Sequence, residues 1–370
     1  MKKNLKKIFL ISLVFSFILP MTTFSATKLS YSGWIPYWAK TAGINDTENN
    51  LSKLKSINPF SYEIDEYGNP IDKIKIGEEP WVSFLGDIRN KKTTATAGRV
   101  KIIPTINSLD GMVIHELIKT AETRKNHIDK IFELISKNNF DGIDIDYENK
   151  KADDRANFSA FLKSLSIKLH ANKKTLSCTI EARTPLSSRF VKIPKDVRYV
   201  NDYVSINKYC DEVKILTYGQ GNIDLLLNKK KGNGKAYLPI ADNEWVTKVI
   251  KESLKNIKAS KIQIGFATYG YEYEIKNNAG KISYSKIRNI NYNDIVALYQ
   301  SKGIIPEKNL AGEFSFIYMD TTSNTNKLVW FSNAETLNDK VKLAKKYGLK
   351  GVALFKFDGG FDKSFWDILK

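Results

Sequence analysis

Eight short runs rich in β-branched and aromatic residues alternate along this chain with longer amphipathic segments, which limits the folds open to it. The runs span residues 32–37, 56–64, 100–107, 142–147, 175–182, 212–218, 261–268 and 351–357. Apolar residues recur at three- and four-residue steps between several of them, which predicts helices over residues 126–138, 155–170, 243–256 and 334–347. Because eight strands separated by helices suit a closed barrel of about 250 residues, we predict the α/β class and a (β/α)8 TIM barrel.

The chain of 370 residues is longer than such a barrel needs, and one tract accounts for much of the surplus. Residues 271–328, which follow the seventh predicted strand, are rich in Tyr, Asn and Lys and contain strand-like patches of their own. We therefore predict a small α+β subdomain inserted between the seventh strand and its helix. The lysine-rich run 228–235 has the composition of a solvated loop, and we expect a loop there.

The amino terminus has the pattern of a secretory signal peptide. Four lysines precede an apolar run over residues 8–19 that is too short to span a bilayer comfortably, and Thr23 and Ser25 supply small residues at the spacing of a cleavage site. We expect residues 1–25 to be removed by cleavage near Ser25, so that residues 26–370 form a secreted protein with no membrane association. An uncleaved amino-terminal anchor is the alternative.

Charge and cysteine content add two expectations. Lys and Arg number 58 against 40 Asp and Glu, a formal net charge of +18 that suits a nucleic acid, a membrane surface or an acidic polymer. No nucleic-acid-binding motif accompanies the charge, so we expect no nucleic-acid partner. The two cysteines, Cys178 and Cys210, could form one disulfide outside the cytoplasm, although their separation in sequence does not fix their geometry.

The stretch Phe-Asp-Gly-Ile-Asp-Ile-Asp-Tyr-Glu at residues 140–148 combines a strand pattern with a row of acids. Because alternate residues of a strand share a face, Asp144, Asp146 and Glu148 point one way and the isoleucines point the other. Isoleucines packed against helices would leave the three carboxylates in the barrel interior, where an unpaired charge costs several kcal/mol. Neighbours in the row stand roughly 6–7 Å apart at Cα, so we expect at least one shared proton. Glu148 lies at the carboxyl end, where barrel active sites form, and a raised pKa there would make it a general acid.

Three other kinds of structure could contain this stretch. A solvated edge strand would expose both isoleucines. A calcium loop needs a glycine after its third acid and polar residues between the acids, whereas here Tyr147 follows Asp146 and isoleucines stand between the acids. A magnesium site for phosphoryl chemistry stays open, because carboxylates alone bind magnesium. The three histidines lie away from predicted strand ends, which leaves little material for a Ser-His triad or a zinc site. We therefore expect a site that uses no metal ion and no other cofactor.

Residues 141–148 resemble the DGxDxDxE signature of glycoside hydrolase family 18. The segment Gly-Trp-Ile-Pro-Tyr-Trp at 33–38, the pair Thr217-Tyr218 and the run from Trp330 into 351–353 resemble further parts of that family, so the resemblance covers nearly the whole chain after residue 25. It implies retaining hydrolysis of a β-linked 2-acetamido sugar, in which the acetamide oxygen of the substrate attacks the anomeric carbon.

The resemblance also implies a role for each site residue. Glu148 would be the only side-chain acid/base, Asp146 would hold the acetamide N–H, and Asp144 would tune Asp146. Tyr218 would hydrogen-bond the acetamide from the opposite wall. Aromatic side chains would form a floor under the sugar, although each could instead pack in the core; they are Trp34, Tyr37, Trp38 and Phe355.

Three departures from the family pattern bear on activity. Gly219 follows Tyr218 where members commonly have Asp, Phe355 stands in place of Trp, and residues 105–108 replace a serine and paired glycines. Gly219 could also serve a turn with positive φ. We expect a monomeric, chitinase-like glycosidase that binds GlcNAc-containing glycans, with chitin oligomers as its default substrate. A peptidoglycan N-acetylglucosaminidase, an enzyme of N-linked glycan cores and a catalytically weak sugar-binding barrel are the alternatives.

Overall fold

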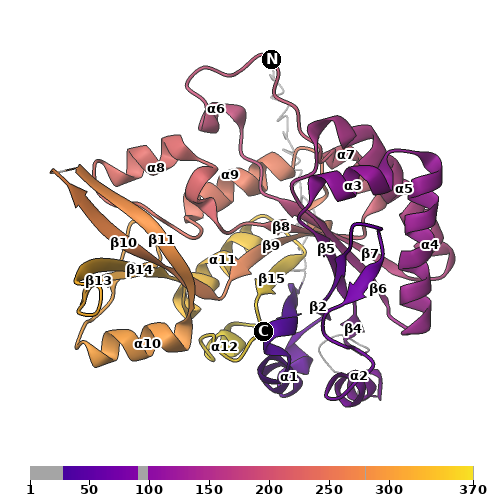
Figure 1. Ribbon diagram of the computed structural model, residues 1–370, viewed down its shortest axis with the longest axis horizontal. Helices are drawn as coiled ribbons and strands as arrows, with labels where there is room; N and C mark the ends of the chain where they lie inside the picture. Colours follow the sequence, from indigo (N-terminus) through magenta and orange to yellow (C-terminus); the bar gives the residue numbers. More distant parts are fainter. Residues whose placement is uncertain (1–27, 91–98, 280, 370) are drawn as a thin grey trace, which may run out of the picture.

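The computed structural model describes residues 28–90, 99–279 and 281–369 (Figure 1). The predicted signal peptide of residues 1–25 lies outside these residues and stays a prediction. Within the described ranges, no helix has the length and apolar character needed to cross a membrane.

Eight parallel strand positions close into a barrel, because β1 pairs with β2 on one side and with β15 on the other. The predicted TIM barrel is therefore confirmed. The third position is split into two short strands around Pro104, which has no backbone N–H to donate to the ladder. In barrel order the strands are β1 (Ser30–Pro36), β2 (Ser56–Ile64), β4 (Lys101–Ile102) with β5 (Thr105–Ser108), β6 (Gly142–Tyr147), β7 (Thr175–Glu181), β8 (Glu212–Leu216), β9 (Ile262–Ala267) and β15 (Gly351–Phe355). A short strand, β3 (Pro70–Asp72), pairs antiparallel with β2.

The four predicted helices are present, and one begins earlier than its apolar pattern suggests. Thr120 caps that helix, α4, and in the first turn that follows Ala121 is the one apolar residue, which is too little to show a helical period. The loop expected at residues 228–235 is wrong, because the helix α8 covers its first half behind an Asp224 cap. The barrel helices are α1 (Lys40–Glu48), α2 (Trp81–Asn90), α3 (Gly111–Ile118), α4 (Ala121–Lys137), α5 (Arg155–Ala171), α6 (Leu186–Arg189), α7 (Tyr203–Tyr209), α8 (Leu225–Gly232), α9 (Asn243–Ser253), α11 (Ala334–Lys346) and α12 (Phe365–Ile368).

A five-stranded antiparallel sheet and one helix form a subdomain between β9 and α11, which confirms the predicted α+β insertion after the seventh barrel strand. Figure 1 shows this subdomain at the left of the barrel. It has a small core of its own, which includes Ile295, Phe316 and Phe331. Its elements are β10 (Tyr269–Asn278), β11 (Lys281–Asn291), α10 (Tyr292–Ser301), β12 (Glu307–Lys308), β13 (Phe314–Asp320) and β14 (Thr325–Phe331).

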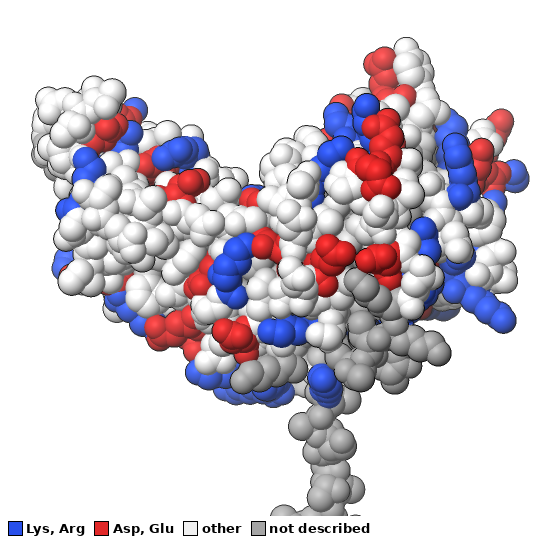
Figure 2. All heavy atoms as spheres, turned by 90° about the horizontal axis from the view of Figure 1, so that it is seen from below, with Lys and Arg blue, Asp and Glu red and all other residues white. Residues whose placement is uncertain are grey.

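The surface in Figure 2 shows how the charges are distributed on the face seen from below. Basic and acidic side chains are interspersed there, and the basic ones form no continuous patch on that face. On this face, therefore, the excess of positive charge is not gathered at one site.

A disulfide joins Cys178 in β7 to Cys210, which immediately precedes the β8 region, with Cα atoms 6.0 Å apart. Both residues are buried. The bridge, which the sequence left open, links β7 to the residue that caps the carboxyl end of α7, two residues before β8 begins.

Replacing both cysteines by alanine should lower the free energy of unfolding by about 3–4 kcal/mol, because the disulfide restricts the unfolded chain across a sequence separation of 32 residues. Urea denaturation measures the change. Dithiothreitol should destabilise the unchanged chain and leave the double variant unaffected. Equal stability of the two proteins under oxidising conditions would contradict the expectation.

Candidate active site

The first carboxylate of the acidic row is fully enclosed in the barrel. Asp144 accepts hydrogen bonds from Thr105 on β5 at 2.9 Å, from Ser177 on β7 at 2.6 Å and from Thr179 at 3.0 Å. Lys214 on β8 forms an ion pair with it, with 3.1 Å between Nζ and Oδ1, and neither side chain is exposed. Contacts to three other strands place the acidic face of β6 in the barrel interior.

The opposite face of β6 packs against helices. Ile143 and Ile145 are buried, and the Tyr147 hydroxyl lies 2.6 Å from Nε2 of His127 on α4. The strand is thus covered on both faces, which excludes an exposed acidic edge. Among the described residues, no group of three His, Cys, Asp or Glu side chains is arranged to hold a metal ion.

Asp146 and Glu148 lie farther along the same face, toward the carboxyl end of β6. Burial raises the pKa of Asp146 well above its usual value, and the neighbouring carboxylates of Glu148 and Asp144 raise it further. Burial also raises the pKa of Glu148. Asp146 is 6% exposed, and its Oδ1 has no hydrogen-bond partner within the described residues. A buried acceptor without a partner is costly, so this atom is available to a ligand.

A fourth carboxylate, Glu181 at the end of β7, acts on Glu148 at the outer end of the row. Its charge adds to the effect of burial and raises the pKa of Glu148 further, whereas the Lys150 ammonium opposes both. Lys150 lies 3.4 Å from Glu181 and also contacts the carbonyl of Tyr147. The Asn201 amide donates to Glu181 at 2.6 Å. Glu181 is therefore held in place beside the acid.

Tyr218 follows β8 and faces the acidic row. Burial raises its pKa well above the usual value, and other nearby acidic groups, Asp146 and Glu148 among them, add to the shift. The hydroxyl therefore keeps its proton and can donate a hydrogen bond. Gly265 on β9 makes room for the ring, since a Cβ there would lie 2.9 Å from it.

Phe355, at the end of β15, is the centre of an aromatic cluster that we call the aromatic floor. The rings of Trp34, Phe60, Tyr218 and Tyr269 lie 5.9–6.3 Å from its ring, centroid to centroid. The Tyr218 and Phe355 rings are nearly parallel, at 14°. The floor thus joins β1, β2 and β15 to the chain after β8 and the start of the subdomain.

The predicted aromatic residues occupy different depths. Trp34 is 1% exposed and its Nε1 donates to Thr105 at 3.0 Å, so it supports the floor from below. Tyr37 lies at the edge, where its ring contacts Trp38 at 4.8 Å. Trp38 is 51% exposed and connects to the floor through Phe60.

Several residues of the site escaped the sequence analysis. Lys214 interrupts the apolar run of β8, and a charged residue inside a barrel strand was the available signal. Glu181 stands at the carboxyl end of its strand, the position that singled out Glu148. Phe60 and Tyr269 carry no local signal, because only the closure of the barrel and the path of the insertion bring them together.

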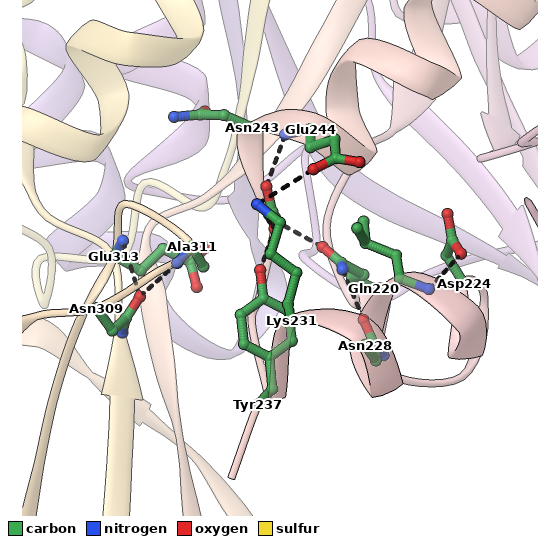
Figure 3. Close-up of polar contacts among 12 residues, drawn as sticks. Gln220, Asp224, Asn228, Lys231, Tyr237, Asn243, Glu244, Asn309, Ala311 and Glu313 are labelled. Atoms are coloured by element: carbon green, nitrogen blue, oxygen red, sulfur yellow. Dashed lines mark hydrogen bonds and ion pairs between the residues drawn. The ribbon is translucent and has the colours of Figure 1, made fainter. Parts of the chain in front are cut away.

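The loop after Tyr218 begins at Gly219, whose φ of 71° lies in the left-handed region. The backbone turn with positive φ therefore explains why a glycine stands at position 219. The next residue, Gln220, accepts a hydrogen bond from the Asp242 N–H at 2.8 Å and donates one to Asn228 at 2.8 Å (Figure 3). These bonds attach Gln220 to α8 and to the residue that caps α9.

Glu313 of the subdomain holds the segment to which Gln220 is bound, since the Gln220 backbone N–H donates to the Ile240 carbonyl at 3.1 Å. Its carboxylate accepts the backbone N–H groups of Ile240 and Ala241, at 2.9 and 2.7 Å, and the indole N–H of Trp330 at 2.5 Å. Figure 3 shows Glu313 and the neighbouring turn at Asn309 beside the loop. The subdomain therefore fixes the segment that carries Tyr218.

Comparisons with known proteins agree on one kind of barrel. A protein-family model described as glycosyl hydrolases family 18 matches residues 33–360. The chain is 27% identical to the uncharacterized glycosylase YvbX of Bacillus subtilis (strain 168), over 90% of this chain and 92% of that protein. It is 22% identical to the cortical fragment-lytic enzyme of the same organism, over 68% of this chain and 54% of that protein. The crystal structure of a chitinase from Chromobacterium violaceum superimposes with a TM-score of 0.70 at 19% identity, covering 92% of this chain and 98% of that one, which shows a shared fold.

Gly219→Ala should lower the free energy of unfolding by about 1–2 kcal/mol, because a side chain at φ 71° carries left-handed strain. Thermal and urea unfolding measure the loss. Gly219→Asn should cost less, since Asn tolerates this region better. The matched control is Gly221→Ala, where an added Cβ meets no heavy atom within 4 Å and the backbone has no positive φ. Equal effects of the two alanine changes would show that the turn does not need glycine.

Proposed function

The chain belongs to glycosyl hydrolases family 18, and from that premise we propose that it hydrolyses β-1,4 bonds next to N-acetylglucosamine by substrate-assisted, retaining catalysis. The observation that carries the proposal is the arrangement at the carboxyl end of β6. Glu148 directly follows the strand and has a raised pKa, and the buried Oδ1 of Asp146 has no hydrogen-bond partner among the described residues.

The proposed reaction needs one side-chain acid and the acetamide of the substrate. Glu148 protonates the glycosidic oxygen, and that bond breaks as the acetamide oxygen attacks the anomeric carbon. Asp146 accepts the acetamide N–H and stabilises the positive charge of the oxazolinium intermediate. Glu148 then takes a proton from water, which opens the intermediate with overall retention.

The other predicted residues support the sugar in this proposal. Tyr218 donates its hydroxyl to the acetamide from the wall opposite β6, which favours the cyclised transition state over the free substrate. Phe355 presents its ring to the sugar, backed by Trp34. Tyr37 and Trp38 extend the aromatic surface toward a neighbouring sugar, where stacking adds affinity.

Chitin oligomers satisfy this chemistry, and peptidoglycan is the second candidate. The same acetamide assistance applies to a GlcNAc-β-1,4-MurNAc bond. Two observations favour peptidoglycan. A relative is named as a cortical fragment-lytic enzyme. Without the four lysines of residues 1–25, an exported protein would keep 54 Lys and Arg against 40 Asp and Glu, and this net charge of +14 would concentrate it at an anionic cell wall. Export itself rests on the amino-terminal pattern of residues 1–25.

The test of substrate is incubation with chitin oligomers, peptidoglycan and an N-glycosylated protein, followed by identification of the new reducing ends. New GlcNAc reducing ends from at least one substrate support the proposal. Tight binding to all three without cleavage would favour a sugar-binding barrel instead.

Glu148→Gln should reduce kcat at least about 100-fold, because glutamine cannot donate the proton to the leaving oxygen. Binding of a GlcNAc oligomer, measured by calorimetry, should largely survive. The control is Glu116→Gln, the same change on the exposed surface of α3, which should leave kcat unchanged. Near-normal turnover by Glu148→Gln would remove Glu148 from the mechanism.

Glu181→Gln should move the basic limb of the pH profile of kcat/KM to lower pH. Glu148 acts only while protonated, and the Glu181 charge raises the pKa of Glu148, so its removal lets the acid lose its proton earlier. The unopposed Lys150 ammonium acts in the same direction. Glu244→Gln, which removes a carboxylate paired with Lys231, is the control and should leave the limb in place. A limb that stays fixed or moves to higher pH in Glu181→Gln would contradict the assignment.

A further inference from the structure

Lys214 is a lysine in the middle of a barrel strand, and the mechanism above gives it no part. Its side chain has no solvent exposure, and its Nζ lies 3.1 Å from Oδ1 of Asp144 and 2.5 Å from the Ser177 hydroxyl. The same Nζ is 5.6 Å from the ring centroid of Trp34. Lys214 thus sits beneath the aromatic floor and beside the acidic row.

The two aspartates of the row differ in what surrounds their oxygens. Asp144 has partners on both oxygens: Oδ1 contacts Lys214 and Ser177, and Oδ2 accepts from Thr105. Asp146 has an Oδ1 without a partner among the described residues. The Asp144 carboxylate is therefore held in one orientation, whereas Asp146 retains an acceptor for a ligand.

We propose that Lys214 is a positioning residue, which keeps Asp144 as a fixed carboxylate and thereby confines the shared proton of the acidic row to Asp146 and Glu148. The inference rests on the proposed function, because it concerns how that reaction obtains its proton. With Asp144 held by Lys214, Ser177 and Thr105, the proton lies on Glu148 when Asp146, as an anion, receives the acetamide N–H. The proton on Glu148 passes to the glycosidic oxygen, and Glu148 later regains a proton from water.

The proposal fixes the sign of two charge changes near Asp146. An unpaired Lys214 ammonium would favour loss of the shared proton, and an unpaired Asp144 carboxylate would oppose it. The pair together contributes little net charge. The other ionisable groups that influence Asp146, all unchanged in the variants, are Glu148, Lys150, Glu181 and Tyr218.

Three variants of the full chain separate these effects. Asp144→Asn leaves the lysine unpaired and should move the basic limb of kcat/KM about one pH unit lower. Lys214→Met leaves the carboxylate unpaired and should move the limb higher. The double variant removes both charges and should return the limb close to its original position, even if kcat stays reduced.

Loss of stability alone needs its own control, because each single variant leaves a buried charge unpaired. Arg288→Met serves, since it leaves the buried Glu272 carboxylate of the subdomain without its ion pair, which has 2.6 Å between Nε of Arg288 and Oε2 of Glu272. It should lower the melting temperature and leave the pH profile in place. If Asp144→Asn and Lys214→Met behave in the same way as this control, Lys214 is only structural and the proposal is wrong.

A second readout needs no substrate. Carboxyl groups labelled with ¹³C report the titration of Asp146 and Glu148 by NMR in the free protein, and their titration midpoints should shift in opposite directions in the two single variants. If no glycan is cleaved but these shifts occur, the proposed function fails and the role of Lys214 stands. Midpoints that stay in place, or that move in one direction in both variants, overturn it.

Discussion

The ion pair between Lys214 and Asp144 is the interaction on which the rest of the site depends. A strand that places three carboxylates on one buried face is unfavourable by itself, because each unpaired charge loses its hydration without compensation. Here the deepest carboxylate receives a lysine and hydroxyl donors from two neighbouring strands, so its charge is balanced inside the barrel. Burial raises the pKa values of the two outer carboxyl groups, Asp146 and Glu148. The charges of Glu148 and Asp144 raise the pKa of Asp146 further, and the charge of Glu181 does the same for Glu148.

Around this pair the barrel arranges two kinds of surface. The aromatic floor centred on Phe355 lies above Lys214, with Trp34 between them. The wall that carries Tyr218 depends on the subdomain, because Glu313 binds the backbone at Ile240 and Ala241, and Ile240 in turn accepts the Gln220 N–H. The Lys214–Asp144 pair in the barrel interior and the Glu313 contacts at its edge therefore both position groups around the place where an acetamido sugar would bind.

Much of this was predictable from the sequence, for a physical reason. The period of two in residues 142–147 and the apolar spacing of the barrel helices are local signals, and the structure has a strand and helices at these positions. Lys214, Glu181 and Phe60 were missed because their meaning comes from neighbours that are distant in sequence. The early start of α4 and the helix α8 were missed because polar turns and lysines carry no apolar period. Sequence reasoning thus identified the acids and could not identify what balances them.

The central claim is that the substrate's acetamide replaces a second catalytic carboxylate. The most direct measurement compares initial hydrolysis rates of a chitin oligomer and of the same oligomer after complete removal of its acetyl groups, at equal saturation of the protein. The account predicts cleavage of the acetylated oligomer and no detectable cleavage of the deacetylated one, because a free amine cannot form the oxazolinium intermediate. Comparable rates for the two oligomers would contradict it.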